Sequence, residues 1–289
     1  MSGPLSPRGR RTSSVRPDPD REASSPMSIL ELDGVAKTYV TRTGTGSVEA
    51  LRPLSMKVEP GSFVSLVGPS GCGKSTLLNI VAGLLEPTSG RVVFEGQPLT
   101  EPSRDMGFMF QRPVLLPWRS VEKNVLLPAE VFGTAGAEIQ DRARETIDLV
   151  GLGEFRTALP RQLSGGMQQR VALARVLTYR PKILLMDEPF GALDEFTRET
   201  MNLELMRLTN PLGITVVFVT HNITEAVFLS DQVAVMSPRP GRLSGVVDVP
   251  FGRDRNVDLM REHKFTDLVF EIRELLKKDE ASREARPRE

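Results

Sequence analysis

One short stretch of the chain constrains its fold more than any other, because it combines closely spaced glycines with a lysine and two hydroxyl residues. It lies between an apolar run at 63–67 and a helix-like segment at 76–85, and it reads Gly68-Pro69-Ser70-Gly71-Cys72-Gly73-Lys74-Ser75-Thr76. It fits the pattern G-x-x-x-x-G-K-[ST], in which backbone N–H groups and a helix N-terminus surround phosphate groups. We expect Lys74 to contact the β- and γ-phosphates and Ser75 to coordinate Mg²⁺. The sequence therefore predicts a site for a nucleoside triphosphate.

Composition bounds what else the chain can do. Its 289 residues are 39% hydrophobic, enough for the core of one large domain or two small ones. Lys plus Arg and Asp plus Glu each number 37, and the resulting zero net charge argues against nucleic acid as a partner. No segment has the roughly eighteen consecutive apolar residues of a membrane span. Residues 1–26 are rich in Pro, Ser and Arg, so we expect a disordered extension and not a secretory signal.

Hydrophobic patterns divide the rest of the chain into predicted strands and helices. Alternating segments at 29–58, interrupted by a Gly- and Thr-rich connection at 41–47, and again at 91–94, indicate antiparallel strands. Apolar runs at 63–67, 183–186 and 215–219 indicate buried parallel strands, and helical patterns at 167–177, 196–208 and 223–229 alternate with them. Between 113 and 163 the strand pattern gives way to a helical one at 137–150. These patterns predict an α/β fold, a P-loop NTPase core of mainly parallel sheet with an antiparallel β layer and a helical insertion.

We expect the chain to have four parts. The extension at 1–26 precedes a nucleotide-binding domain at 27–252, which contains a helical subdomain at about 112–178. A C-terminal helical segment follows at 253–277, and a charged tail at 278–289. One face of the late helix carries the apolar residues Phe265, Leu268, Val269, Ile272, Leu275 and Leu276. Because its polar face has no excess of basic residues, docking onto the core is favoured over binding to a membrane surface.

Two acidic residues follow the predicted strand at 183–186. The carboxyl end of a buried parallel strand lies beside the phosphate loop in this class of fold, so Asp187 can hold the Mg²⁺ shell. Glu188 projects elsewhere and can deprotonate a water molecule in line with the γ-phosphate. An acidic pair at a strand end would otherwise indicate a solvated loop, and the upstream phosphate loop decides against that alternative.

A second glycine-containing segment precedes the predicted helix at 167–177. It reads Leu163-Ser164-Gly165-Gly166-Met167-Gln168-Gln169-Arg170. Ser164 can cap a helix whose first N–H groups, unobstructed at Gly165 and Gly166, form another anion site. Taken alone, the segment fits a plain loop before an apolar helix equally well.

The order of these motifs resembles that of ABC-type ATPases, from residue 29 to about residue 252. The segment Gly191-Ala192-Leu193-Asp194 and then His221 follow the acidic pair as they do in that family. The resemblance implies that the chain binds ATP with Mg²⁺, hydrolyses it, and forms a head-to-tail homodimer around two ATP molecules. It also implies that Asp194 lies at the dimer seam. The residues implied to contact the partner subunit's nucleotide are Ser164, Gly165, Gly166 and Gln168.

Three further residues gain a role only through this resemblance. Tyr39 resembles the aromatic residue that stacks on adenine, whereas elsewhere it would be a half-buried packing residue. Gln111, after a strand-like run at 106–110, resembles the glutamine that reaches Mg²⁺ and the attacking water. His221, at the carboxyl end of a predicted strand, resembles the histidine that contacts the γ-phosphate. The expected catalytic set is Lys74, Gln111, Glu188 and His221, and the expected metal ligands are Ser75, Gln111 and Asp187.

The segments 110–118, 190–198 and 237–242 are similar to those of bacterial nitrate/sulfonate/taurine importer ATPases. With no coiled coil, second cassette or membrane-spanning region, the chain is expected to be a separate importer subunit at the cytoplasmic face of the membrane. Membrane-spanning permease subunits, and through them an extracytoplasmic solute-binding protein, are its expected partners. The alternatives are the energy subunit of an exporter or lipid-handling complex and a soluble non-transport ATPase. Because the chain ends soon after the late helix, we expect no C-terminal regulatory domain.

An apolar cluster that follows Gln111 is the expected contact with the permease. It reads Val114-Leu115-Leu116-Pro117-Trp118, and such a cluster would be costly on a free surface but suits a groove for a short helix. The alternative for Trp118 is packing inside the helical insertion.

Overall fold

The computed structural model describes residues 3, 28–40, 46–134 and 136–284. The expected disordered extension, Gly3 apart, and most of the expected connection at 41–47 lie outside these residues. Along the chain the elements are β1 (Leu30–Val40), β2 (Ser47–Val58), β3 (Phe63–Val67), α1 (Lys74–Val81), β4 (Ser89–Phe94), β5 (Gln97–Pro98), β6 (Met106–Met109), α2 (Val121–Val125), α3 (Leu127–Phe132), α4 (Ala137–Leu149), η1 (Gly153–Phe155), η2 (Pro160–Gln162), α5 (Gly165–Leu177), β7 (Ile183–Asp187), α6 (Glu195–Thr209), β8 (Thr215–Thr220), α7 (Ile223–Leu229), β9 (Gln232–Met236), β10 (Leu243–Asp248), η3 (Val257–Arg261) and α8 (His263–Glu284).

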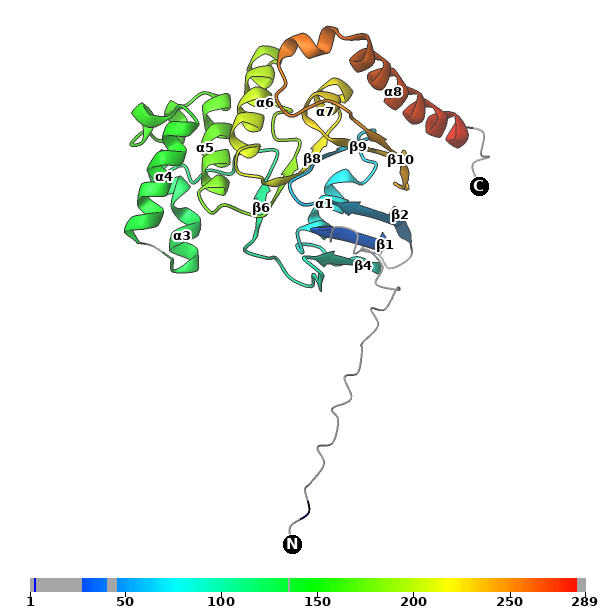
Figure 1. Cartoon of the computed structure of the whole chain (residues 1–289), viewed down its shortest axis with the longest axis horizontal. Helices are drawn as coiled ribbons and strands as arrows, with labels where there is room; N and C mark the ends of the chain where they lie inside the picture. The colour runs from blue at the N-terminus through cyan, green and yellow to red at the C-terminus, as the bar shows by residue number, and fades with distance from the viewer. Residues whose placement is uncertain (1–2, 4–27, 41–45, 135, 285–289) are drawn as a thin grey trace.

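Two sheets form the centre of the fold (Figure 1). The larger has the order β10-β9-β3-β8-β7-β6, with parallel pairing from β9 to β6 and an antiparallel β10 at its edge. The smaller, antiparallel sheet has the order β2-β1-β4-β5. Apolar residues of α1 pack in one core cluster with residues of both sheets. The expected α/β core and its antiparallel layer are thus confirmed.

The predicted buried strands and the helices between them occur as β3, β7, β8, α5, α6 and α7, with small differences at their ends. Helix α1 differs more, since it begins at Lys74 and ends at Val81 instead of covering 76–85. Gly73 caps it with a φ of 107°, so the helix starts inside the glycine-rich motif. Beyond its C-terminal end, Gly83 takes a φ of 70°, in the left-handed region that ends helices. The shift places Lys74 and Ser75 in the first helical turn.

Helices α2 to α5, with η1 and η2, form a helical subdomain on one side of the larger sheet (Figure 1). A separate apolar cluster holds it together, with Val125, Ile147 and Val171 all fully buried. We predicted only α4 and α5 from the sequence. The short α2 is capped by Ser120, whose hydroxyl accepts a hydrogen bond from Lys123 N, but five residues are too few to show a helical period.

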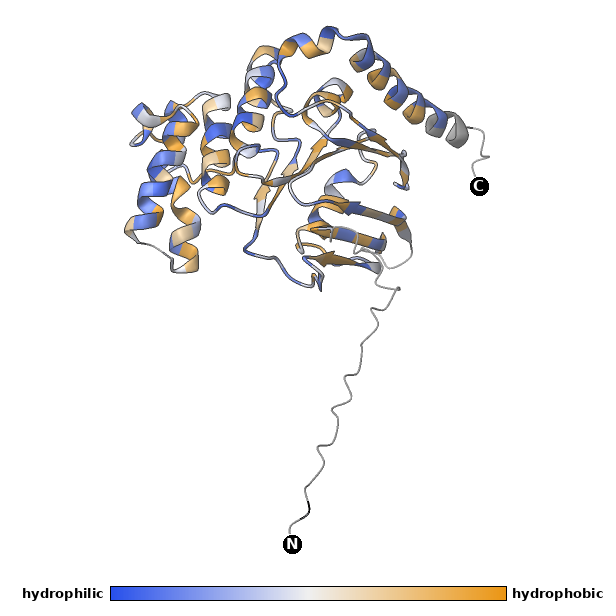
Figure 2. Cartoon of the chain, viewed as in Figure 1, coloured by the Kyte–Doolittle hydropathy of each residue, from blue (hydrophilic) through white to orange (hydrophobic). Residues whose placement is uncertain are grey.

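Helix α8 packs on the larger sheet through the apolar face expected from the sequence. Phe265, Val269 and Ile272 are buried, and Leu268, Leu275 and Leu276 are half-buried against the same core cluster. Figure 2 shows the apolar residues of α8 on its inner side and the polar residues outside. The helix continues to Glu284, past the expected end of the helical segment at residue 277. No helix in the described ranges is long and apolar enough to cross a membrane.

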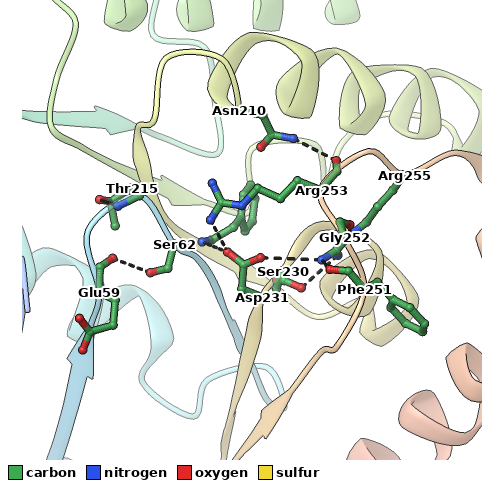
Figure 3. Close-up of polar contacts among 12 residues, drawn as sticks. Glu59, Ser62, Asn210, Thr215, Ser230, Asp231, Phe251, Gly252, Arg253 and Arg255 are labelled. Atoms are coloured by element: carbon green, nitrogen blue, oxygen red, sulfur yellow. Dashed lines mark hydrogen bonds and ion pairs between the residues drawn. The ribbon is translucent and has the colours of Figure 1, made fainter. Parts of the chain in front are cut away.

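Arg255 fixes the segment that leads into α8 (Figure 3). Its side chain is only 2% exposed, yet all three guanidinium nitrogens donate to backbone carbonyls. Nη1 binds the carbonyl oxygens of Val227 at 3.2 Å, Phe228 at 2.8 Å and Ser230 at 3.0 Å, at the C-terminal end of α7. The buried cation therefore satisfies carbonyls that the helix itself leaves without donors.

Candidate active site

The phosphate loop is built by a change from strand to helix. All five residues of β3 are buried, and the loop from Gly68 connects their carboxyl end to α1. A Cβ atom on Gly68 would lie 2.9 Å from Met236 O, and one on Gly73 would lie 2.6 Å from Leu51 Cδ2. Both positions thus need glycine for close packing, and Gly73 also needs it for its positive φ. The loop backbone is held in a curve at the N-terminus of α1, where N–H groups attract anions.

A cleft of about 430 Å³ opens above this loop. Tyr39, Val48 and Ala50 of the antiparallel sheet line it, and so does Glu188, which follows β7. The remaining lining residues are Ser70, Gly71, Gly73, Lys74, Ser75, Thr76 and Arg239. The fold therefore brings Tyr39, the phosphate loop and Glu188 together from distant parts of the sequence. Tyr39 is 41% exposed, and Lys37 Nζ lies over its ring, 5.5 Å from the centroid.

Ser75, which lines the cleft, contacts Asp187 at the carboxyl end of β7. The Ser75 hydroxyl donates to Asp187 Oδ1 at 3.0 Å. Burial raises the pKa of Asp187, and the bond from Ser75 opposes that effect only in part. Lys74 is buried, and its Nζ donates to the carbonyl oxygens of Gly68 at 2.8 Å and Pro69 at 3.1 Å. A hydroxyl and a carboxylate oxygen thus lie beside a cation, a donor set that fits Mg²⁺ bound to phosphates.

Glu188 and His221 form a pair at the carboxyl ends of β7 and β8. His221 Nδ1 lies 3.1 Å from Glu188 Oε2. The two strands are parallel neighbours in which Asp187 pairs with Val219, so each strand delivers its next residues to the same edge. Glu188 has a φ of 43°, an uncommon conformation for a residue with a side chain, and its N–H is fixed by Val219 O at 3.0 Å. This geometry lets a carboxylate act as a base while the imidazole orients it.

Hydrogen bonds among Thr220, Asn222 and Glu225 fix the backbone on both sides of His221. Thr220 Oγ1 donates to Glu225 Oε2 at 2.5 Å and accepts from Asn222 N at 3.0 Å. Asn222 Oδ1 in turn accepts from Glu225 N at 3.1 Å and caps α7. Glu225 was not predicted from the sequence. An Asn followed three residues later by Glu, the pattern of a helix start, was the signal that could have identified it.

The glycine-containing segment at 163–170 lies apart from the cleft of its own chain. Ser164 caps α5 by accepting from Met167 N at 3.3 Å, as expected. Gln168 Nε2 donates to Pro160 O at 3.1 Å and Leu163 O at 3.3 Å, so this side chain braces its own loop. A Cβ atom on Gly166 would lie 3.0 Å from Thr197 Cγ2, on the first turn of α6, which Asp194 caps. The residues outside the lining of the cleft are Ser164, Gly165, Gly166 and Gln168.

Gln111 also stands outside the lining of the cleft. It is exposed in the loop after β6, and its carbonyl oxygen accepts a hydrogen bond from Gln169 Nε2 at 3.0 Å. Since Gln169 belongs to α5, this bond connects the loop to the helix that begins at Ser164. Among the described residues, the side chain of Gln111 forms no hydrogen bond with Asp187, whose side chain accepts from Ser75.

Comparisons with known proteins agree with this geometry. The family described as "ABC transporter" matches residues 51–191. The taurine import ATP-binding protein TauB of Rhizobium johnstonii is 44% identical over 264 residues, covering 89% of this chain and 100% of that protein. The aliphatic sulfonates import ATP-binding protein SsuB of Bacillus cereus is 40% identical, covering 81% and 92%. The nitrate import ATP-binding protein NrtC of Synechococcus elongatus is 43% identical over 85% of this chain, which spans 38% of that longer relative.

Solved structures give the same result. A dimeric ATP-binding cassette in a post-hydrolysis state, bound to ADP and Pi, matches with a TM-score of 0.68 and 36% identity, covering 77% of this chain and 100% of that one. The chain belongs to the ABC transporter family, among relatives that include nitrate, aliphatic sulfonate and taurine import ATP-binding proteins, and it is an ATP hydrolase.

Proposed function

We propose that the chain powers a bacterial importer for a small solute of the nitrate, sulfonate or taurine type. The observation that carries the proposal is a cleft lined by Tyr39, the phosphate loop and Glu188, in a chain that matches the taurine import protein over the whole length of that relative. The solute itself is chosen by other subunits, so it is a property of the complex. We infer that the chain acts at the cytoplasmic face of the membrane as a peripheral subunit.

In the proposed mechanism, Lys74 binds the β- and γ-phosphates from the first turn of α1. Ser75 and Asp187, with Gln111 after closure of its loop, would hold Mg²⁺, which neutralises charge on the phosphates. Glu188 takes the proton of the attacking water, and His221 keeps the carboxylate oriented toward that water through the 3.1 Å contact. Tyr39 stacks on the adenine ring at the outer wall of the cleft.

The site is completed by a second copy of the chain in this proposal. Ser164, Gly165, Gly166 and Gln168 lie outside the cleft of their own chain, and the amino end of α5 is a capped helix terminus suited to an anion. A head-to-tail homodimer would bring this terminus over the partner's ATP, with Asp194 at the seam. The dimeric cassette among the solved relatives supports the same assembly.

Coupling to a permease is proposed for the apolar segment at 114–118. Trp118 is 73% exposed and Val114 is 57% exposed, so neither packs inside the helical subdomain. The backbone beneath them is fixed, because Arg175 donates to the carbonyl oxygens of Pro113 and Val114, each at 2.9 Å. A rigid loop that presents apolar side chains to solvent fits a groove for a short permease helix.

The test is a pull-down in mild detergent followed by mass spectrometry, with Trp118→Asp as the variant. We expect wild type to retain a permease with an importer-type binding protein, and Trp118→Asp to lose it while keeping ATP binding. Trp118 is preferred to Leu116, which is half-buried and bonded through its backbone to Asn124. Val131→Asp, in α3 of the same subdomain and 71% exposed, is the matched control. An exporter subunit in the wild-type sample would support the alternative function, and normal capture by Trp118→Asp would refute the docking segment.

A further inference from the structure

The turn between β9 and β10, at residues 237–242, contributes no residue to the proposed mechanism. Its backbone is closed by Ser237, whose N–H donates to Arg242 O at 2.9 Å and whose hydroxyl accepts from Arg242 N at 3.1 Å. The same hydroxyl is 3.1 Å from Pro238 O and 3.4 Å from Pro240 O. Two prolines and these bonds make the turn a rigid support.

The turn is fixed against two walls of the nucleotide cleft. Gly241 N donates to Ala50 O at 2.9 Å, and Arg52 N donates to Gly241 O at 2.8 Å, so the turn is bonded to β2. On the other side, a Cβ atom on Gly241 would lie 2.0 Å from Cys72 O. Only glycine permits this contact with the phosphate loop. The position of the turn relative to the cleft is therefore set by backbone contacts.

Arg239 extends from this turn into the cleft. It is exposed, lines the same cleft as Tyr39 and Lys74, and donates from Nε to Gly71 O at 3.2 Å. A Cβ atom built on Gly71 would lie 3.8 Å from Nη2, so the guanidinium sits beside the phosphate loop. Within the described residues no carboxylate forms an ion pair with it. The other charged residues of the lining are Lys74 and Glu188, whose charges cancel. Arg239 thus gives the cleft its positive excess.

We propose that Arg239 is an additional ATP-binding residue, which donates hydrogen bonds to the polyphosphate from the side opposite Lys74. The inference rests on the proposed nucleotide site. A guanidinium presents several N–H donors in a plane that matches phosphate oxygens, and such charge-assisted bonds are stronger than neutral ones. Its hydrogen bond to Gly71 O, in the phosphate loop, favours the phosphates over the base as the contact.

The experiment measures the affinity of the full chain for ATP and GTP in Arg239→Ala, Arg239→Lys and Arg242→Ala. Arg242→Ala is the matched control, because Arg242 lies in the same turn and its substitution also removes one positive charge. We expect Arg239→Ala to weaken both nucleotides by about tenfold, an effect that shrinks at high salt, and Arg239→Lys to recover part of the loss. The KM for ATP should rise with kcat unchanged.

Three results would overturn the assignment. Unchanged ATP affinity in a folded Arg239→Ala would remove the contact. A loss for ATP but not for GTP would indicate a contact with the base, and an equal loss in Arg242→Ala would indicate a general effect of charge. Lys74→Ala separates this inference from the proposed site: if Lys74→Ala weakens binding and Arg239→Ala does not, only the role of Arg239 is wrong.

Discussion

The two ends of helix α7 differ in how completely their buried polar groups are hydrogen-bonded. At the C-terminal end, Arg255 donates to three carbonyl oxygens of the helix end and to two of its own segment, and leaves none of its nitrogens unused. At the N-terminal end, Glu225 bonds to Thr220 through one oxygen, while Oε1 is buried without a hydrogen-bond partner in the described part of the chain. One helix thus has a saturated end and an incompletely satisfied end.

The difference follows from what each end contacts. The C-terminal end joins α7 to the segment that leads into α8, and a cation there also interacts favourably with the helix dipole. The N-terminal end directly follows His221, which contacts Glu188 in the cleft. Burial raises the pKa of Glu225, and the Thr220 hydroxyl and the nearby Asn202 side chain offset this only in part, so the carboxyl is held at a cost in stability. We infer that the C-terminal end anchors the helix and the N-terminal end serves the catalytic residues.

The largest effect, on ATP hydrolysis, is expected at Glu188, which contacts His221 just before the N-terminal end of α7. Glu188→Gln should retain ATP binding while hydrolysis falls by roughly 10²- to 10⁴-fold, because the base is lost but the phosphate loop remains. Steady-state hydrolysis and ATP binding measure the two properties separately. Lys74→Ala is the comparison variant and should abolish hydrolysis by weakening the hold on the phosphates.

The same Glu188→Gln variant tests the assembly. With hydrolysis blocked, it should accumulate as an ATP-bound dimer on size-exclusion chromatography. A variant that stays monomeric with ATP, even with the permease present, would contradict the head-to-tail arrangement, and a Lys74→Ala variant with normal turnover would contradict the site itself.

A smaller effect, on stability, is expected at the anchored end. Arg255→Ala leaves five carbonyl oxygens without their donor, three of them in buried hydrogen bonds, and should reduce the free energy of unfolding by about 2–4 kcal/mol, with kcat per folded molecule unchanged. Urea denaturation measures the loss. Arg253→Ala is the control, because Arg253 is 42% exposed and its ion pair with Asp231 at 2.7 Å should contribute under about 1 kcal/mol. Equal reductions in the free energy of unfolding of Arg255→Ala and Arg253→Ala would show that Arg255 stabilises the fold no more than a surface ion pair does.

The sequence could predict those residues whose role depends on a local pattern. The glycine-rich loop, the acidic pair after β7 and the apolar face of α8 each have a characteristic spacing along a few neighbouring residues, and the structure forms the corresponding strands and helices. The expected assignment of catalytic roles to Lys74, Gln111, Glu188 and His221 stays a prediction.

Residues whose role depends on distant backbone could not be found in this way. Arg255 reads as one more charged residue near the C-terminus, and only the fold brings it to carbonyl oxygens of α7 more than twenty residues earlier in the chain. Arg239 likewise contacts Gly71 only because β9 and β3, which precede the two residues, are neighbours in the sheet. Strands β9 and β10 were also not predicted, although Val233, Val235 and Met236 belong to an apolar run. The two strands are recognised only through the pairing of β9 with β3 and of β10 with β9.

The smallest effect is expected from Glu225 and depends on pH. Because burial raises its pKa in the folded chain, the stabilising contribution of the protonated carboxyl is fully present below the ordinary glutamate pKa of about 4.3 and is lost as the pH rises through the folded value. Glu225→Gln keeps a neutral side chain at every pH. The free energy of unfolding of Glu225→Gln relative to wild type should therefore increase as the pH rises through this window and then level off. Urea denaturation at a series of pH values measures it, with Glu271→Gln on the exposed face of α8 as the control for loss of one charge. A difference that stays constant or falls with rising pH would show that the carboxyl is well satisfied, and the contrast between the two ends of α7 would then disappear.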